Sequence, residues 1–372
     1  MSLATEKSPP IAKPNPSGAR RPRGAGKSHR ITMTDIAREA GCSQATVSFV
    51  LNRTEGMKIS PEMCARVVEV ARALGYSPAN FANVLRPEAP ATTEGTIGFL
   101  VDQLATSPEA AIAIDSARQE AWRAGNIVVS AQTMSDPIME RRAIKTLLSH
   151  GASAMIYMTM ITRELKPHEL LYELGIPLVL LNCYTADHAF PSAIPSEIAG
   201  GQGATGHLIE HGHRRVATIL GEIWMDAASS RLEGYRRALA TADIPYDPEL
   251  VIHGDWSTTG GYEATRKLLA LKNPPTAIFC QNDRTAVGCY DALREAGLSI
   301  PHDVSVVGYD DEEISRHLRP RLTTCVLPHR AMGRWAVEHL GEPYFRERKR
   351  YPITKIECSL VPRGSVAPRQ SY

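Results

Sequence analysis

The sequence predicts an α/β protein in which an all-α helix-turn-helix domain precedes a pair of doubly wound parallel-sheet subdomains. Three observations lead to this fold class. Short capped helical segments fill residues 31–76, a Pro/Ala/Thr-rich stretch follows at 77–95, and β-branched runs alternate with helix-length amphipathic segments across 96–372. Such strand–helix alternation is typical of parallel sheets with helices on both faces. The β-branched runs are TIGFLV, NIVVSA, AMIYM, PLVLLN, RVATIL, TAIFCQN and VSVVGY.

The composition excludes several classes of protein. The chain of 372 residues is 43% hydrophobic and 22% charged, which is typical of a globular protein with a sizeable core. No apolar run approaches the about 20 residues of a membrane helix, and the N-terminal segment has no apolar stretch like that of a secretory signal. The seven cysteines are scattered and form no C-x-x-C pair. We therefore expect a cytoplasmic protein with reduced thiols and no membrane partner.

The first 30 residues form a basic segment. They contain seven Lys and Arg residues against Glu6 alone, a local charge of +6, whereas the whole chain has a net charge of +2. Their Pro, Gly and Ser content predicts disorder, because such a segment cannot bury enough apolar surface to fold. Three interpretations stay open: a solvated tail, a misplaced start, or a basic arm that contacts DNA phosphates.

Residues 31–76 predict three short helices, over 33–40, 44–52 and 61–74. Ala37 and Val47 are expected where the first two helices touch, and Gly41 makes the turn between them. Ala37 and Gly41 are four residues apart, and Gly41 and Val47 are six residues apart. These spacings match a DNA-binding helix-turn-helix. The residues expected to cap or end the three helices are Thr32, Asp35, Gly41, Ser43, Ser60, Pro61 and Gly75.

The second helix is the predicted reader of DNA bases. Its N-terminal outward side chains are Gln44 and Ala45, with Phe49 one turn further on the same face. Gln can pair bidentately with adenine, whereas Ala and Phe can only contact a thymine methyl group or exclude water. Short polar side chains around this face suit phosphate contacts, although each could equally be an ordinary cap or surface residue. They are Thr32, Ser43, Thr46, Ser48 and Asn52.

The segment ITMTDIAREAGCSQATVSFVLN, followed by ISPE, ARALGYSPANFANVLR and TIGFLV, resembles the LacI family of bacterial transcription regulators. The resemblance extends from residue 31 to about residue 367. It implies that residues 77–95 hold a hinge helix and linker, and that Leu85 wedges into the minor groove of a palindromic operator. It also implies a homodimer or tetramer. Phe49 departs from the family pattern, and Asn80, Phe81 and Asn83 make the hinge less basic than usual.

The resemblance further implies a core like that of periplasmic sugar-binding proteins, with a ligand cleft between the two subdomains of 96–372. Residues after the carboxyl ends of strands line such clefts, and Arg231, Asn282 and Asp310 match effector-contacting positions of the family. Guanidinium, amide and carboxylate groups can form paired hydrogen bonds with a hydroxyl-rich ligand, and an aromatic ring can pack against its C–H groups. Four of the candidate residues also have an ordinary structural alternative. Arg231 and Asp310 could form surface salt bridges, Trp256 could belong to the core, and Glu109 could be a solvated acid at the start of a helix. The predicted effector-binding residues are Glu109, Asn182, Arg231, Trp256, Asn282 and Asp310.

Three other patterns resemble chemistry that we do not expect here. The G-Q-G-A-T-G run at 201–206 falls within a helix, where we expect close backbone packing and not a dinucleotide site. His207 and His211 lie four residues apart without a suitably spaced third zinc ligand. The carboxylates of 310–313 come from one loop and cannot flank a glycosidic bond from opposite faces. We therefore predict no metal, no cofactor and no enzymatic activity.

The predicted function is that of a transcriptional repressor whose operator affinity depends on a carbohydrate-like effector. The alternative is a periplasmic-type sugar-binding protein, which would share the two-sheet core but not residues 31–86. Whether the effector releases the operator or promotes its binding stays open, because the family does both.

Overall fold

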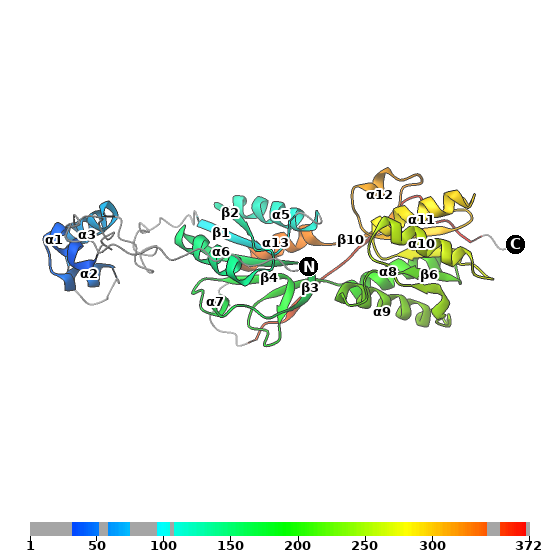
Figure 1. Cartoon of the computed structure of the whole chain (residues 1–372), viewed down its shortest axis with the longest axis horizontal. Helices are drawn as coiled ribbons and strands as arrows, with labels where there is room; N and C mark the ends of the chain where they lie inside the picture. Colours follow the sequence, from blue (N-terminus) through cyan, green and yellow to red (C-terminus); the bar gives the residue numbers. More distant parts are fainter. Residues whose placement is uncertain (1–31, 52–58, 75–94, 105–107, 341–349, 370–372) are drawn as a thin grey trace, which may run out of the picture. The chain divides into compact units, whose positions relative to one another are not determined.

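The computed structural model describes residues 32–51, 59–74, 95–104, 108–340 and 350–369. The chain divides into two compact units, Met1–Leu85 and Arg86–Tyr372 (Figure 1). The basic segment 1–30 lies outside the described residues, as do Asn52, Leu85 and the predicted hinge up to residue 94.

The N-terminal unit contains three helices, α1 (Met33–Ala40), α2 (Gln44–Leu51) and α3 (Pro61–Ala73). The predicted capping box is present, because Thr32 and Asp35 bond to each other's backbone N–H groups. Gly41 ends α1 in the left-handed conformation, with φ of 72°. The helices enclose a small apolar core that consists of Ile36, Ala37, Ala40, Val47, Val50, Leu51, Val67 and Ala71.

The first subdomain of the larger unit is built on a six-stranded sheet with the order β11-β5-β4-β3-β1-β2, and its strand pairs are parallel. Helices α5 and α13 pack on one face, and α6 and α7 pack on the other. The elements are β1 (Gly95–Val101), α5 (Glu109–Arg123), β2 (Asn126–Gln132), α6 (Pro137–Ser149), β3 (Ala152–Leu165), α7 (Glu169–Tyr172), β4 (Leu178–Thr185), β5 (Ser192–Pro195), α13 (His329–Leu340) and β11 (Ile353–Ile356).

The second subdomain repeats the architecture with the strand order β12-β10-β9-β8-β6-β7, in which the short β12 is antiparallel to β10. Helices α8 and α9 cover one face, and α10 and α11 cover the other. The elements are α8 (Glu197–Glu210), β6 (Val216–Ile219), α9 (Asp226–Thr241), β7 (Val251–Ile252), α10 (Thr258–Leu269), β8 (Ala277–Cys280), α11 (Asp283–Glu295), β9 (Ser305–Asp310), α12 (Ile314–His317), β10 (Thr323–Val326) and β12 (Leu360–Val361).

The chain passes between the two subdomains three times, after β5, after β10 and after β11. Helix α13 therefore follows a strand of the second sheet but packs against the first, where the Ser116 hydroxyl of α5 donates to the carbonyl of Arg330 at 2.6 Å. Two subdomains joined by several short connections can rotate against each other about those connections, which is the geometry of a hinged cleft.

Helices α8 and α9 approach each other closely through glycines. A Cβ atom on Gly201 would overlap the backbone of Arg231, and one on Gly234 would overlap the carbonyl of Ile198. The expectation of close packing is thus met at Gly201, but it is wrong at Gly203 and Gly206, where a Cβ would have open space. Only part of the G-Q-G-A-T-G run faces the neighbouring helix.

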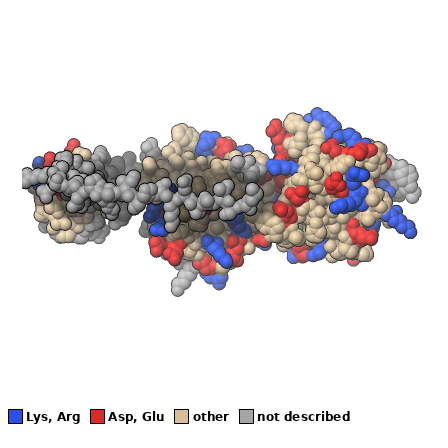
Figure 2. All heavy atoms as spheres, in the orientation of Figure 1, with Lys and Arg blue, Asp and Glu red and all other residues tan. Residues whose placement is uncertain are grey.

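The surface of the larger unit carries charges of both signs. In the face that Figure 2 shows, Lys and Arg side chains are interspersed with Asp and Glu side chains. In the described part of the chain, no helix is both long enough and apolar enough to cross a membrane.

The close helix crossing gives a matched pair of substitutions. We expect Gly201→Ala to destabilise the protein by about 1–3 kcal/mol, because the added methyl group overlaps backbone that cannot move aside. We expect Gly203→Ala on the same helix to be neutral or stabilising by up to ~1 kcal/mol, because alanine is the better helix former. Urea unfolding measures both; equal free energies of unfolding for the two variants would contradict the packing described.

Candidate functional sites

Helix α2 presents the residues predicted to contact DNA. Gln44 and Ala45 are exposed at its N-terminus, and Phe49 is half-buried one turn later. The Ser43 hydroxyl accepts from the Thr46 N–H at 3.0 Å and contacts its hydroxyl at 2.8 Å. These polar groups therefore already act as a helix cap, as Thr32 does for α1. Ser48 is half-buried on the same helix.

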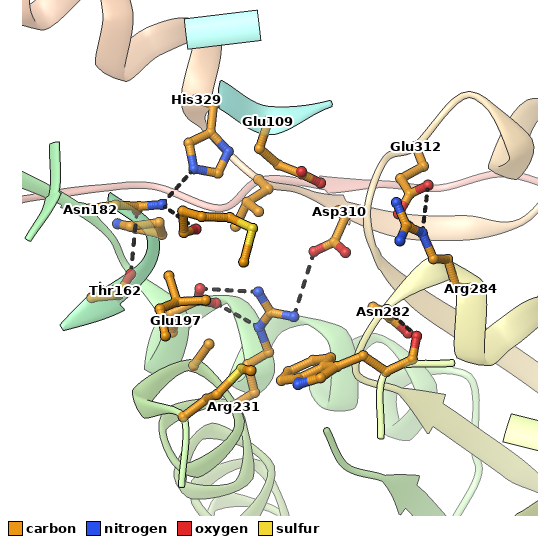
Figure 3. Close-up of a pocket in the computed structure, with 17 residues that line it drawn as sticks. Glu109, Thr162, Asn182, Glu197, Arg231, Asn282, Arg284, Asp310, Glu312 and His329 are labelled. Atoms are coloured by element: carbon orange, nitrogen blue, oxygen red, sulfur yellow. Dashed lines mark hydrogen bonds and ion pairs between the residues drawn. The ribbon is translucent and has the colours of Figure 1, made fainter. Parts of the chain in front are cut away.

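The larger unit contains a cavity of about 210 Å³ between its two subdomains (Figure 3). All six residues predicted to bind an effector line it. The first subdomain contributes Glu109, Met160, Ile161, Thr162, Asn182, Pro195 and His329. The second contributes Glu197, Met225, Ala227, Arg231, Trp256, Asn282, Arg284, Asp310, Glu312 and Leu327.

Arg231, on α9, is the buried cation of the cavity. Its guanidinium donates to both oxygens of Glu197, at 2.7 and 3.0 Å, and also to the carbonyl of Gln281. Asp310 lies 3.6 Å away as a second carboxylate, and the Tyr309 ring lies beneath the guanidinium at 3.7 Å. Because most of its donors bond within the protein, Arg231 holds the wall in place and leaves little for a ligand.

The carboxylates of residues 310–313 lie in different environments. Asp310 points into the cavity, whereas Asp311 pairs with Arg316 and Arg363. Burial raises the pKa of the Asp310 carboxyl well above its usual range, and the charge of Arg231 opposes that shift. The Asp310 Oδ1 atom is buried and lacks a hydrogen-bond partner. A ligand donor can therefore satisfy it.

Trp256 and Asn282 form one unit in the second subdomain. The Asn282 side chain caps α11 by accepting from the Thr285 N–H at 2.9 Å, and it donates to the carbonyl of Trp256 at 3.0 Å. The indole lies against Gly221, where a Cβ atom would overlap the ring. Its Nε1–H is buried without a partner. Asn282 thus positions the aromatic side chain, whose free N–H donor is available to a ligand.

Asn182 corrects one expectation, since it does not end its strand. Strand β4 continues to Thr185, and Asn182 adopts a left-handed φ of 57° where the register against β3 shifts. This bulge turns its side chain inward. Its Nδ2 group donates to the carbonyl of Met160 at 3.1 Å and bonds to His329 Nε2 at 2.9 Å.

These bonds fix the protonation of His329, which is buried at 1% exposure. The carbonyl of Met160 can only accept, so the Asn182 group facing it is the NH₂ group, and that group also donates to His329 Nε2. The ring proton must then lie on Nδ1, which has no partner. Burial lowers the pKa of the imidazole to about 3, and the charge of Arg231 adds to the shift. His329 is therefore a neutral donor.

Glu109, Asp310 and Glu312 bring one carboxylate oxygen each to within 4.8 Å of one another, the one group of potential cation ligands found in the described ranges. Glu312 pairs with Arg284 at 3.0 Å. Glu109 begins α5, and its Oε2 atom is buried without a partner. His207 and His211 form no such group with other described residues; their ring centroids lie 4.4 Å apart, and His211 Nδ1 bonds to the carbonyl of His207 at 2.8 Å.

Five polar residues of the cavity were not among the predicted site residues, namely Thr162, Glu197, Arg284, Glu312 and His329. His329 follows β10, whose sequence TTCV lacks the apolar pattern of the strands that were recognised. Glu197 was readable as the first residue after Pro195 and Ser196 open a helix. Arg284 and Glu312 each lie two residues beyond a predicted site residue, Asn282 and Asp310 respectively.

The comparisons with known proteins agree with this architecture. Residues 32–79 match bacterial regulatory proteins of the lacI family, and residues 205–366 match the periplasmic binding protein-like domain. The ribose operon repressor of Haemophilus influenzae is 31% identical, over 90% of this chain and 98% of that protein. The transcriptional regulator CelR–cellobiose complex is 28% identical with a TM-score of 0.61, over 90% and 100%. The lac repressor dimer bound to operator and the anti-inducer ONPF is 27% identical with a TM-score of 0.61, over 91% and 99%.

The neutral state of His329 predicts a dependence of stability on pH. In the folded state the pKa of the imidazole is about 3, so the ring stays unprotonated down to that pH, whereas in the unfolded state it takes up a proton near its ordinary pKa of 6.5. Stability from this group is therefore complete above about pH 6.5 and is lost as the pH falls. Between pH 7 and pH 5 we expect the wild type to lose about 2 kcal/mol more than His329→Gln. Urea unfolding at both pH values checks this, and parallel losses would contradict it.

Proposed function

The chain belongs to the LacI family of bacterial regulatory proteins, and on that premise we propose that it is a transcriptional repressor whose operator affinity is controlled by a small sugar-like ligand. One observation carries the proposal: the same chain holds an exposed, capped helix-turn-helix and a cavity walled by two hinged subdomains. The family's curated relatives are repressors and not enzymes, which agrees with the expectation from the sequence.

Helix α2 is the element proposed to enter the major groove. Ala37 and Val47 are buried at the helix contact, so α2 is held rigidly against α1. Gln44, at the exposed N-terminal end, has the side chain suited to paired hydrogen bonds with adenine. Thr32, Ser43, Thr46 and Ser48 are proposed to contact phosphates; Asn52 and Leu85 keep their proposed roles from the sequence.

A sugar-like ligand suits the cavity because the cavity wall has both hydrogen-bond donors and acceptors without partners. Glu109 and Asp310 offer buried acceptors, and His329 and Trp256 offer buried donors. A hydroxyl group can both donate and accept, so a hydroxyl-rich molecule can satisfy such a set. Two of the similar proteins support this class, since one is a ribose operon repressor and the other is in complex with cellobiose.

The proposed mechanism is a linkage between the cavity and the DNA-binding unit. A ligand that contacts both walls favours the closed arrangement of the two subdomains, since only that arrangement brings both walls within reach. Closure would shift the first subdomain, which leads into the segment that connects it to the helix-turn-helix. A coupling of about 1–3 kcal/mol is typical of such systems, and the ligand contributes only its difference in affinity for the two states.

A homodimer is proposed because one helix-turn-helix reads only half of a palindrome. Exposed apolar side chains occur on successive elements of the first subdomain, namely helix α5, the edge strand β2, the loop after it and helix α6. They are Trp122, Ile127, Val129, Met134, Ile138 and Met139, six of the eleven exposed large hydrophobic side chains in the described segments. A patch of this kind marks an interface. The lac repressor in complex with operator is likewise a dimer.

The alternative of a periplasmic-type sugar-binding protein accounts for the cavity but leaves the helix-turn-helix without a role. We therefore place the protein in the cytoplasm, where a repressor meets its DNA.

Base reading by α2 is tested by Gln44→Ala. We expect the variant to lose about 1–3 kcal/mol of binding free energy at one base pair of the operator. Binding to unrelated DNA should not change, because phosphate contacts supply that affinity. The operator is first selected from a random DNA pool by the wild type, and single-base variants of it are then titrated. Equal losses on every sequence would contradict the role of Gln44.

Ligand response is tested by Asp310→Asn, with Asp303→Asn as a matched control on an exposed loop of the same subdomain. The first variant replaces one of the two carboxylate oxygens that face the cavity by an NH₂ group, so we expect it to bind operator but to lose the ligand response. The control should respond normally. Operator titrations with and without the sugar that most raises the melting temperature of the wild type measure this. An unchanged response in Asp310→Asn removes that residue from the site.

The proposed interface is tested by Ile138→Asp, with Ile138→Val as the control. An acidic residue in the first turn of α6 favours the helix, so folding should be preserved while the charge opposes association. We expect a monomer with at least ~10-fold weaker operator binding, against a dimer for the control. Analytical ultracentrifugation reports the mass; a dimeric Ile138→Asp variant would locate the interface elsewhere.

A further inference from the structure

The charge of the cavity restricts the ligand more narrowly than the proposed function does. Four carboxylates line it, from Glu109, Glu197, Asp310 and Glu312, against the two guanidinium groups of Arg231 and Arg284. His329 adds no charge, because burial keeps it neutral. The lining therefore has a formal charge of −2, and it stays negative even when Asp310 is protonated. A negative cavity disfavours phosphorylated and carboxylated ligands.

Among the described residues, three of the four carboxylates lie beside an arginine, whereas the fourth does not. Arg231 contacts Glu197 and Asp310, and Arg284 contacts Glu312. Glu109 has no ion pair with any described residue, yet its Oε2 atom is buried. An unpaired carboxylate is costly once a cleft closes and excludes water. A ligand that carries a positive charge beside Glu109 would remove that cost.

The three oxygens lie close enough together to contact one ammonium group. Glu109, Asp310 and Glu312 each place one oxygen within 4.8 Å of the other two. An ammonium group donates three charge-assisted hydrogen bonds of about 2.8 Å in tetrahedral directions, which places its acceptors about 4.6 Å apart. The guanidinium groups of Arg231 and Arg284 lie beside the same oxygens and would repel a divalent metal ion more strongly than a single charge.

An independent observation on the other wall points to a ligand oxygen. His329 Nδ1–H is a donor without a partner on a side chain that is only 1% exposed. His329, Glu109 and Asp310 all line the cavity (Figure 3), and oxygens of Glu109 and Asp310 lie within 4.8 Å of each other. A ligand that fits both features has an amine together with an oxygen acceptor.

We propose that the effector is an amino sugar, or a similar hydroxylated amine, whose ammonium group binds between Glu109, Asp310 and Glu312. The proposal rests on the proposed function, since it names the ligand class of the same cavity. His329 Nδ1–H donates to a ring or hydroxyl oxygen of this ligand, and the Trp256 N–H on the opposite wall supplies a second donor.

The test compares D-glucosamine, D-galactosamine and D-mannosamine with their parent hexoses and their N-acetyl derivatives at pH 7, by calorimetric titration of the full chain. We expect at least one amino sugar to bind at least ~10-fold more tightly than both of its neutral counterparts. Glu109→Gln should remove that preference. Glu120→Gln, on the same helix α5 but paired with Arg123 outside the cavity, should keep it.

The outcomes separate this inference from the proposed function. A neutral hexose that binds as tightly as its amino counterpart and changes operator binding would overturn the inference alone. Thermal stabilisation by Ca²⁺ or Mg²⁺ alone, lost in Glu109→Gln, would overturn it in favour of a metal. A panel in which no sugar binds or changes operator affinity would count against both.

Discussion

The cavity depends on the buried guanidinium of Arg231. One positive charge holds the Glu197 carboxylate by two hydrogen bonds, attracts Asp310 and rests on the Tyr309 ring. The position of Arg231 is in turn set by helix packing, because Gly201 allows α8 to approach its backbone directly. A buried cation without partners would be strongly destabilising, so the glycine crossing, the salt bridge and the shape of the cavity are consequences of one arrangement.

The two walls of the cavity differ in character. The wall from the second subdomain is charged and is fixed by ion pairs around Arg231. The wall from the first is held by hydrogen bonds of the Asn182–His329 pair. A ligand that bonds to both walls opposes their separation, and the three short connections allow the walls to move. This division gives a physical basis for a switch with two states, since a ligand can bond to a charged wall on one side and to a hydrogen-bonding wall on the other.

The sequence predicted the elements whose signals are local. The capping box at Thr32, the left-handed Gly41 and the strand end at Asp310 follow from short-range chemistry, and the comparisons confirm the fold class. The strand that was expected to end at Asn282 ends at Cys280, and Asn282 caps helix α11 instead. The sequence could not place His329, because the preceding TTCV strand owes its stability to buried threonine hydrogen bonds that depend on segments far along the chain, such as Ser365 and Asp283. It also assigned Asn182 to a strand end, since a bulge depends on the register of the neighbouring strand. The difference between the crowded Gly201 and the open Gly203 depends on the position of the neighbouring helix, which the sequence of one helix does not show.

The central claim is that the cavity and the operator site are thermodynamically linked, and linkage must be reciprocal. The most direct measurement uses one ligand that binds the full chain and determines four dissociation constants. These are the constants for operator with and without saturating ligand, and for ligand with and without saturating operator. The account predicts two equal ratios, of about 5- to 150-fold. Ratios of one in both directions, for a ligand that demonstrably occupies the cavity, would contradict it.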